Sequence, residues 1–131
     1  MAYPKDFKYT KDHEWVQPTG KSRARVGITE YAQNQLGDIV FVELPKVGAA
    51  FEVGRPFGTV ESVKSVSELY APVSGKVAAV NEELNDAPED INHDPHGDGW
   101  MVEVDLAEPA ELDALLTAAQ YEAYLKEESA G

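Results

Sequence analysis

Short apolar segments with a two-residue period, separated by glycines and prolines, place the tightest limit on the fold of this chain. In residues 23–28 and 39–44, apolar side chains alternate with other residues, a pattern typical of strands with one buried face. In the second segment, the alternation predicts that Val40, Val42 and Leu44 share a face. Strands this short, with turns this frequent, favour a small sandwich or barrel over a parallel sheet with crossover helices.

A hairpin is predicted around Lys64. The apolar segments 57–61 and 69–73 lie on either side of the polar, hydroxyl-rich residues 62–67. Two strand-like segments with a polar connection between them are typical of a β-hairpin. Lys64 is therefore expected near the tip.

Beyond the hairpin, strands are expected at 76–80 and 100–106, joined by an irregular segment at 81–99. Before it, a short helix is predicted between Thr29 and Gly37. Threonine is a favoured N-cap residue, and glycine commonly ends a helix because it adopts the left-handed backbone conformation without strain.

The end of the chain has the pattern of helices. Pro109 suits the first position of one helix. Thr117 and Gln120 have the spacing of a capping box, which predicts the start of a second helix. Residues 1–6 and 127–131 are expected to fray, because chain ends have few partners.

The length of 131 residues predicts one domain, spanning 1–131, with its core in about 7–125. An apolar fraction of 43% with 27% charged residues is typical of a globular chain.

The formal charge of −13, from 24 acidic and 11 basic residues, disfavours nucleic acid and anionic membranes as partners. Such a field steers a protein toward basic patches on larger partners, or simply keeps it soluble. The chain has no cysteine, which excludes disulfides, thiolate metal sites and a catalytic thiol.

The first fifteen residues have neither the apolar stretch of a signal peptide nor the arginine-rich pattern of a transit peptide. No later segment has membrane-spanning length. These features predict a soluble protein of the bacterial cytoplasm, with a processed mitochondrial chain as the alternative.

Lys64 is poorly placed to act as a catalyst. A lysine that reacts as a free amine needs burial or a neighbouring cation to lower its pKa, and a hairpin tip in an acidic chain offers neither. The same position presents the amine well to a modifying enzyme. The alternative is an ordinary solvated lysine.

The residues around Lys64 decide between these interpretations. Residues 61–65 read Glu-Ser-Val-Lys-Ser and residues 72–75 read Pro-Val-Ser-Gly. These strings resemble the modification hairpin of the glycine cleavage H proteins, where the lysine carries lipoate. Biotin carriers usually flank this lysine with methionines, and dehydrogenase lipoyl domains with aspartate and alanine; neither pattern occurs here. The likeness continues through His-Glu-Trp at 13–15 and Asp-Gly-Trp at 98–100, and covers nearly the whole chain.

The resemblance implies a mainly β barrel-sandwich hybrid with a short helix in the N-terminal half and helices at the C-terminus. It implies lipoate joined covalently to Lys64, with Glu61, Val63, Ser65 and Gly75 supporting the hairpin and its recognition. Gly75 would permit a tight turn where a Cβ atom would clash.

The resemblance also implies a function. In H proteins, the lipoyl group takes the aminomethyl unit of glycine from a pyridoxal-dependent glycine decarboxylase to an aminomethyltransferase. Dihydrolipoyl dehydrogenase then reoxidises the dithiol. The chain would be a monomeric, non-catalytic carrier that also meets a lipoate-attaching enzyme. Two alternatives remain open: an H-like relay of lipoyl or octanoyl groups to other lipoate-dependent complexes, and an unmodified interaction domain.

Two further clusters are weaker candidates. In the family, a groove near Glu14 receives the loaded arm, so this carboxylate is a candidate partner for the amine of the adduct. Its neighbours His13 and Trp15 are expected to pack an N-terminal strand. Residues 93–98 gather histidines and aspartates, but their spacing matches no zinc motif and no metal site is predicted. His96 stands where an aromatic residue is common in the family.

Overall fold

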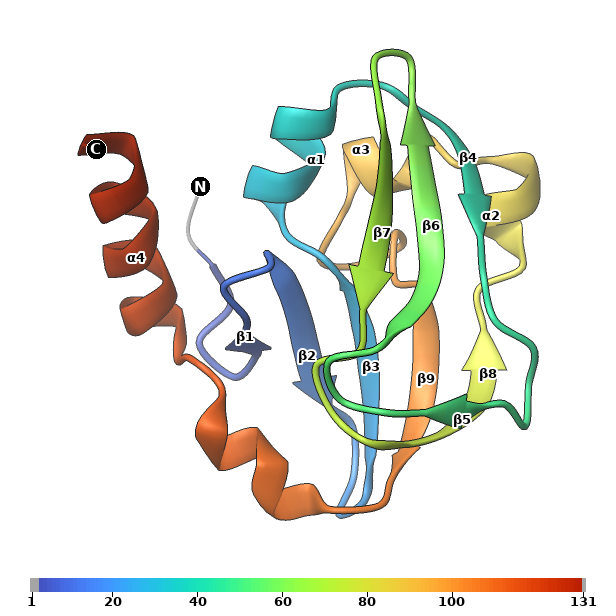
Figure 1. Cartoon of the computed structure of the whole chain (residues 1–131), viewed down its shortest axis with the longest axis vertical. Helices are drawn as coiled ribbons and strands as arrows, with labels where there is room; N and C mark the ends of the chain where they lie inside the picture. Colours follow the sequence, from blue (N-terminus) through green and yellow to red (C-terminus); the bar gives the residue numbers. More distant parts are fainter. Residues whose placement is uncertain (1–2, 131) are drawn as a thin grey trace.

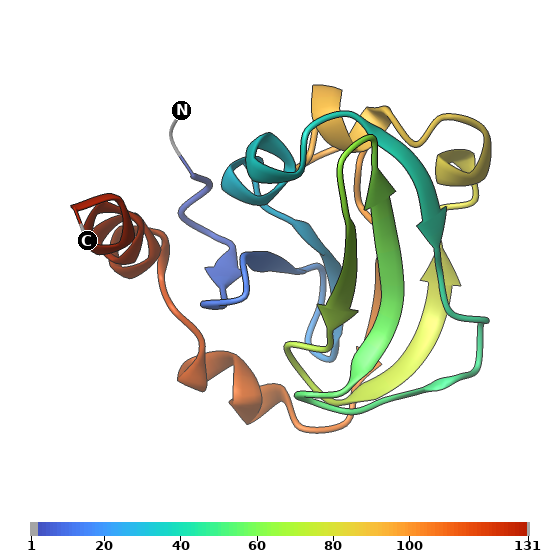
Figure 2. The same cartoon turned by 45° about the horizontal axis from the view of Figure 1, so that its top comes forward.

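The computed structural model describes residues 3–130, which form two antiparallel β-sheets that face each other, with helices at their margins (Figures 1 and 2). The larger sheet contains, in spatial order, β1 (Lys8–Tyr9), β2 (Glu14–Pro18), β3 (Arg23–Ile28), β9 (Val102–Leu106), β8 (Gly75–Val80) and β5 (Ala50–Phe51). The smaller sheet contains β4 (Ile39–Glu43), β6 (Pro56–Ser62) and β7 (Val66–Tyr70). The predicted mainly β architecture is confirmed.

The main core lies between the two sheets. Val26 and Val104 reach it from the larger sheet, and Val42 and Val60 from the smaller one. Full burial of one such side chain stabilises the fold by about 2 kcal/mol relative to exposure. The two sheets therefore hold each other in place, although the residues that meet are far apart in the sequence.

The hairpin around Lys64 is tighter than the sequence predicts. β7 begins at Val66, and only residues 63–65 remain outside the strands. Val60 pairs with Ser67 and Thr59 with Glu68. Strand pairing uses backbone hydrogen bonds, so polar residues such as Ser67 and Glu68 can belong to β7.

The predicted alternation in β4 is wrong. Ile39 and Val42 are buried, whereas Val40 and Phe41 are both exposed. The register against β6 shifts between Ile39 and Phe41. A bulge of this kind inserts one extra residue and re-aims the side chains around it, which a strict two-residue period cannot anticipate.

The helix α1 (Glu30–Leu36) has the predicted caps. The Oγ1 atom of Thr29 accepts a hydrogen bond from the backbone N–H of Ala32 at 3.2 Å. Gly37 ends the helix with a φ of 85°, a conformation that favours glycine.

The segment at 81–99, predicted to be irregular, contains two single-turn helices, α2 (Glu83–Asp86) and α3 (Asp90–His93). Neither has a side-chain N-cap, and one turn is too short to display a helical period. Leu84 and Ile91 are completely buried. Tertiary packing, rather than local sequence, therefore stabilises these turns.

Of the two predicted C-terminal helices, the first is a 3₁₀ helix, η1 (Pro109–Ala114). The second is α4 (Ala118–Ala130), which begins at the predicted capping box. Thr117 donates its backbone N–H to Oε1 of Gln120 at 2.9 Å, and Gln120 donates its own to Oγ1 of Thr117 at 3.2 Å.

A second, aromatic core attaches α4 and the N-terminal segment to the sheet. The rings of Tyr9 and Tyr121 stack at 4.9 Å, and the ring of Tyr3 meets Tyr121 edge-on at 5.2 Å. Tyr3 and Pro4 contact this core, and α4 continues to Ala130; the fraying of the two ends stays a prediction. Residues 1, 2 and 131 lie outside the described residues.

Candidate functional site: the Lys64 hairpin and the groove beside it

Lys64 stands at the tip of the β6–β7 hairpin, which extends beyond the rest of the smaller sheet (Figure 1). The hydroxyl of Ser62 accepts hydrogen bonds from the backbone N–H groups of Lys64 and Ser65, at 3.3 and 3.1 Å. The backbone N–H of Val63 donates to the carbonyl of Asp38 at 3.0 Å. The tip is therefore held in one conformation while the side chain of Lys64 stays exposed.

Ser62 organises this tip, although no pattern in the sequence indicates a role for it. Its side chain is only 5% exposed, and its backbone N–H donates to the carbonyl of Ser65 at 2.8 Å. The only sequence signal was its place two residues before Lys64, where a hydroxyl can hydrogen-bond the backbone of the following turn.

The stem of Lys64 lies against the C-terminal end of α1. A Cβ atom built on Gly37 would lie 3.4 Å from Cε of Lys64 and 3.9 Å from its Cδ. Because Gly37 has no side chain, nothing separates the lysine stem from the helix end. Leu36, the last residue of α1, precedes Gly37 and lines a groove.

This groove, which we call the α1–β7 groove, has a volume of about 180 Å³. Its apolar part includes Ile28, Leu36 and Leu69, and Asp12 and Glu68 add carboxylates. The full lining is Asp12, His13, Glu14, Ile28, Tyr31, Ala32, Gln35, Leu36, Ser67, Glu68 and Leu69. It thus joins the N-terminal segment, α1 and the edge strand β7 in one surface.

Glu14 is the buried carboxyl group of this groove. It is 2% exposed. Its Oε2 atom accepts the backbone N–H of Tyr70 at 2.8 Å, and its Oε1 atom accepts the hydroxyl of Thr10 at 3.3 Å. Burial raises the pKa of Glu14 to about 8, against the opposing effect of these two hydrogen bonds. An acid with this pKa is largely protonated near neutral pH and becomes charged when a cation approaches.

The raised pKa of Glu14 predicts a pH-dependent stability. Between its ordinary pKa of 4.5 and about 8, the unfolded chain has released this proton and the folded chain still holds it, so the free energy of unfolding falls as pH rises. Across that window, wild type is expected to lose stability relative to Glu14→Gln by up to about 1.4 kcal/mol per pH unit. Urea unfolding of both proteins at about pH 5 and about pH 9 measures this difference. Parallel pH profiles would contradict the raised pKa.

His13 lines the groove, and its ring contacts two residues of α4. Its Nδ1 atom lies 2.9 Å from the hydroxyl of Tyr121, and its Nε2 atom 3.6 Å from a carboxylate oxygen of Glu128. Its φ of 68° is unusual for a residue with a side chain. Burial lowers the pKa of His13, so the ring favours its neutral form. Trp15 is completely buried, and its Nε1–H donates to the carbonyl of Pro95 at 2.9 Å. Packing roles for His13 and Trp15 agree with these contacts.

The hairpin residues named from the sequence divide into two groups. Glu61, Val63 and Ser65 lie beside Lys64. Gly75 lies at the opposite end, where β8 pairs with β5 (Figure 1). It stands in a strand, not in the expected turn, and a Cβ atom there would fall 2.0 Å from the backbone oxygen of the facing strand. A side chain at Gly75 would therefore clash, as the sequence predicts, but with the neighbouring strand β9 and not within a turn.

The histidine-rich loop has a structural role. Nε2 of His96 accepts the backbone N–H of Glu30 at 3.1 Å, at the start of α1. Asn92 donates to the carbonyl of Gly37 at 2.9 Å and accepts the N–H of Ile39 at 2.8 Å, at its other end. Among residues 3–130, no group of three histidine or acidic side chains is arranged to hold a metal ion.

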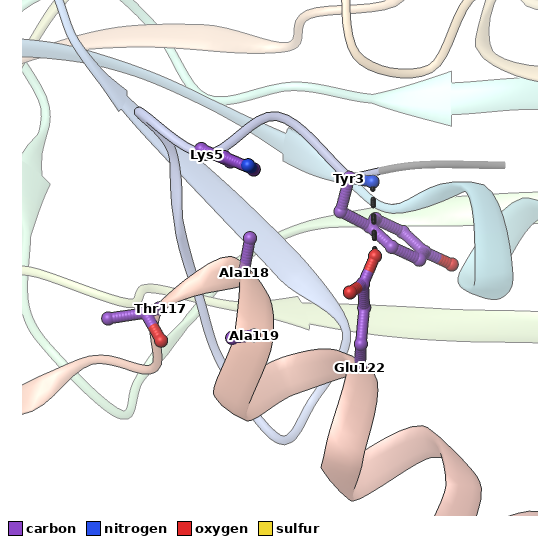
Figure 3. A pocket seen from close by; sticks show the side chains of 6 residues that line it. All are labelled: Tyr3, Lys5, Thr117, Ala118, Ala119 and Glu122. Atoms are coloured by element: carbon purple, nitrogen blue, oxygen red, sulfur yellow. Dashed lines mark hydrogen bonds between the residues drawn. The ribbon is translucent and has the colours of Figure 1, made fainter.

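A larger cavity of about 350 Å³ lies between the N-terminal segment and the start of α4 (Figure 3). Its lining is Tyr3, Lys5, Thr117, Ala118, Ala119 and Glu122. The backbone N–H of Tyr3 and the carboxylate of Glu122 already face each other across it at 3.4 Å. None of the lining residues belongs to the hairpin, so we assign the cavity no part in the site.

The sequence and the fold are similar to those of known proteins. The sequence profile of the family described as "Glycine cleavage H-protein" matches residues 7–128. The chain belongs to this family. The glycine cleavage system H protein of Koribacter versatilis is 61% identical over 129 residues, which cover 98% of both chains. That of Acidobacterium capsulatum is 59% identical, with the same coverage.

A crystal structure agrees with the assignment. The glycine cleavage system H protein of Mycobacterium marinum matches with a TM-score of 0.83 at 42% identity, covering 95% of this chain and 99% of that one. The barrel-sandwich fold and the membership predicted from the sequence are confirmed. The family carries lipoate and serves the glycine cleavage system. Within residues 3–130, no helix combines the length and apolar character needed to cross a membrane.

Proposed function

We propose that this chain is the lipoyl-carrying shuttle of a bacterial glycine cleavage system, with lipoate in amide linkage to Nζ of Lys64. The observation that carries the proposal is the path from Lys64 to Glu14. An exposed amine stands on a rigid tip, its stem lies over Gly37, and the α1–β7 groove begins at the neighbouring Leu36. An apolar arm with a cationic end would fit this path, because the groove has both apolar and acidic walls.

The dimensions of the groove suit such an arm. The seven residues of α1 span about 10 Å at 1.5 Å per residue, which is shorter than an extended lysine stem carrying a medium-chain acyl group. Ile28, Leu36 and Leu69 would hold the carbons of the arm. The acidic end of the groove, with Asp12 and Glu14, would receive the terminal amine.

Bound lipoate supplies a disulfide that accepts an aminomethyl group and, as the dithiol, carries two electrons. The chain itself shelters and orients this cargo. Glu14 would release its proton to solvent when a cationic amine on the arm approached, because a nearby positive charge favours the carboxylate. Asp12 and Glu68 add negative charge to the groove, and its walls would limit the access of water to a bound arm.

We assign the chain no turnover of its own. The aminomethyl group comes from glycine decarboxylase and passes to aminomethyltransferase, and the electrons pass to dihydrolipoyl dehydrogenase. Attachment to one protein makes each transfer effectively intramolecular after docking, at effective concentrations of about millimolar for a short flexible link. An exposed tip is the position from which an arm reaches several different enzymes.

The test is an intact mass and a peptide map of protein from lipoate-replete cells with an active lipoate-attaching enzyme. We expect one lipoyl group, on Lys64, and glycine-dependent release of carbon dioxide when the three enzymes are added. A chain that stays unmodified under these conditions would refute the proposal. A modified chain that fails with these enzymes, but passes its acyl group to another lipoate-dependent complex, would instead be a relay.

A further inference from the structure

One buried hydroxyl, on Tyr121 of α4, lies where two walls of the α1–β7 groove meet. Its oxygen is 2.9 Å from Nδ1 of His13 and 2.8 Å from Oγ1 of Thr29. His13 leads directly into Glu14, and Thr29 is the N-cap of α1. Tyr121 is completely buried, and the groove lining includes no residue of α4. A residue outside the groove therefore joins two of its walls.

The hydrogen bonds at this junction have one consistent direction. Oγ1 of Thr29 already accepts the backbone N–H of Ala32 at 3.2 Å, and among the described residues its one further partner is Tyr121. Thr29 therefore donates its proton to Tyr121, and Tyr121 donates its own to Nδ1 of His13. The proton of the neutral ring then lies on Nε2, which is 3.6 Å from a carboxylate oxygen of Glu128. This order of donors selects one tautomer of His13.

The backbone of His13 needs such support. Its φ of 68° is a conformation that residues with a side chain rarely adopt. Conformations of this kind persist where the surrounding structure fixes them. The carbonyl of His13 accepts the backbone N–H of Thr29 at 3.0 Å, and its ring centroid lies 4.6 Å from that of Tyr31. Because Glu14 is the next residue, the direction of its side chain depends on this turn.

We propose that Tyr121 is a positioning residue of the α1–β7 groove, whose hydroxyl holds the His13 turn against the start of α1 so that Glu14 can meet the end of a loaded arm. Glu128 supports this arrangement by accepting Nε2–H of His13. The inference rests on the proposed function, because it assigns the groove to the arm of Lys64. It makes α4 a part of the site from outside the groove.

The first measurement uses the unmodified chain, so it does not depend on lipoate. Nitrogen chemical shifts should show the ring proton of His13 on Nε2 in wild type. Carbon-13 titration of Glu14 then compares wild type with Tyr121→Phe, which keeps the ring and removes the hydroxyl. We expect the pKa of Glu14 to fall toward its ordinary value in this variant, because looser walls admit water to the carboxyl group. Asp12 and Glu68, the other carboxylates of the groove, are the same in both proteins.

Tyr9→Phe is the matched control. Tyr9 is also completely buried, and its ring stacks on that of Tyr121 at 4.9 Å. Its hydroxyl donates to the carbonyl of Pro4 at 2.7 Å, away from the groove. Each substitution removes one hydrogen-bonded hydroxyl from the same aromatic core, so both should lower the urea midpoint by similar amounts. Only Tyr121→Phe should change the pKa of Glu14.

The second measurement follows the lipoylated chain after loading with glycine and glycine decarboxylase and separation from the enzyme. Hydrolysis of the adduct consumes one water, releases formaldehyde and ammonia and leaves the dithiol, so the rate of formaldehyde release measures protection by the groove. We expect this rate to be about fivefold higher in Tyr121→Phe than in wild type, as the loss of one hydrogen bond would give. Tyr9→Phe should release formaldehyde at the wild-type rate.

A ring proton on Nδ1 of His13 in wild type would overturn the inference, as would equal Glu14 pKa values and equal release rates in Tyr121→Phe and Tyr9→Phe. Either result would leave the proposed function intact. A wild-type chain that cannot be loaded would instead count against the proposed function, while the measurements on the unmodified chain still test the inference.

A second variant tests the inference if Tyr121→Phe proves too unstable to load. Glu128→Ala removes the acceptor of the His13 ring proton from an exposed position of α4, and the adjacent, exposed Glu127→Ala is its control. Release about twofold faster in Glu128→Ala alone supports the inference, in keeping with a partly exposed contact. Equal rates in these two variants overturn it.

Discussion

Replacement of Lys64 by arginine is expected to reduce lipoylation and glycine-dependent carrier activity to background. Arginine keeps the positive charge and the exposed position, but its guanidinium cannot form the amide with a carboxyl group that the lysine amine forms. Lys64 makes no side-chain hydrogen bond or ion pair that could stabilise the fold, as far as the described residues extend. The free energy of unfolding should therefore stay within about 0.5 kcal/mol of wild type.

The matched control is Lys76→Arg. Lys76 is also exposed, in β8, and its replacement should change neither modification nor activity. Intact mass spectrometry after co-expression with the ligase, followed by the reconstituted glycine cleavage assay, gives both measurements. A Lys64→Arg chain that still gains a lipoyl group would move the attachment site to another lysine.

The second large effect is expected at Gly75, on stability. A Cβ atom at this position would lie 2.0 Å from the backbone oxygen of Asp105 and 2.8 Å from Cγ1 of Val104. Real Cβ atoms do not approach a backbone oxygen so closely, so β8 and β9 must separate in Gly75→Ala. Overpacking of this kind should lower the free energy of unfolding by about 3 kcal/mol or more, a large part of the total stability of a small domain.

Gly20→Ala is the control for this effect. A Cβ atom on Gly20 would meet nothing within 4 Å, so this substitution should leave stability unchanged or raise it slightly. Urea unfolding of the two variants and wild type gives the comparison. Equal stability of Gly75→Ala and wild type would show that the strands tolerate a wider spacing here. Lipoylation of Gly75→Ala should fall only under conditions where the variant unfolds, because Gly75 lies far from Lys64 (Figure 1).

Much of the fold was predictable because its signals are local. Thr29 and Gly37 cap α1, and Thr117 and Gln120 begin α4, through contacts between residues only a few positions apart. The hairpin around Lys64 was also visible, although β7 starts earlier than its apolar residues suggest. The bulge at Val40 and the single turns α2 and α3 were not predictable, because neither produces a period in the sequence.

The candidate site was also only partly predictable from the sequence. The sequence identified Lys64 and Glu61 by the string around them, and it named Glu14 as a candidate. It gave no indication of Asp12, Glu68 or the other walls of the groove.

By itself, the sequence determined where most of the longer strands lie, the caps, the hairpin and the lysine at its tip, since each depends on neighbours along the chain. Only the tertiary structure decided what surrounds them. Glu14 is buried and accepts a hydrogen bond from the backbone of Tyr70, 56 residues away. Burial of Glu14 and exposure of Phe41 depend on how distant strands pair and where one register shifts. A residue's environment is a property of the segments packed around it, and periodicity within one segment carries no information about that packing.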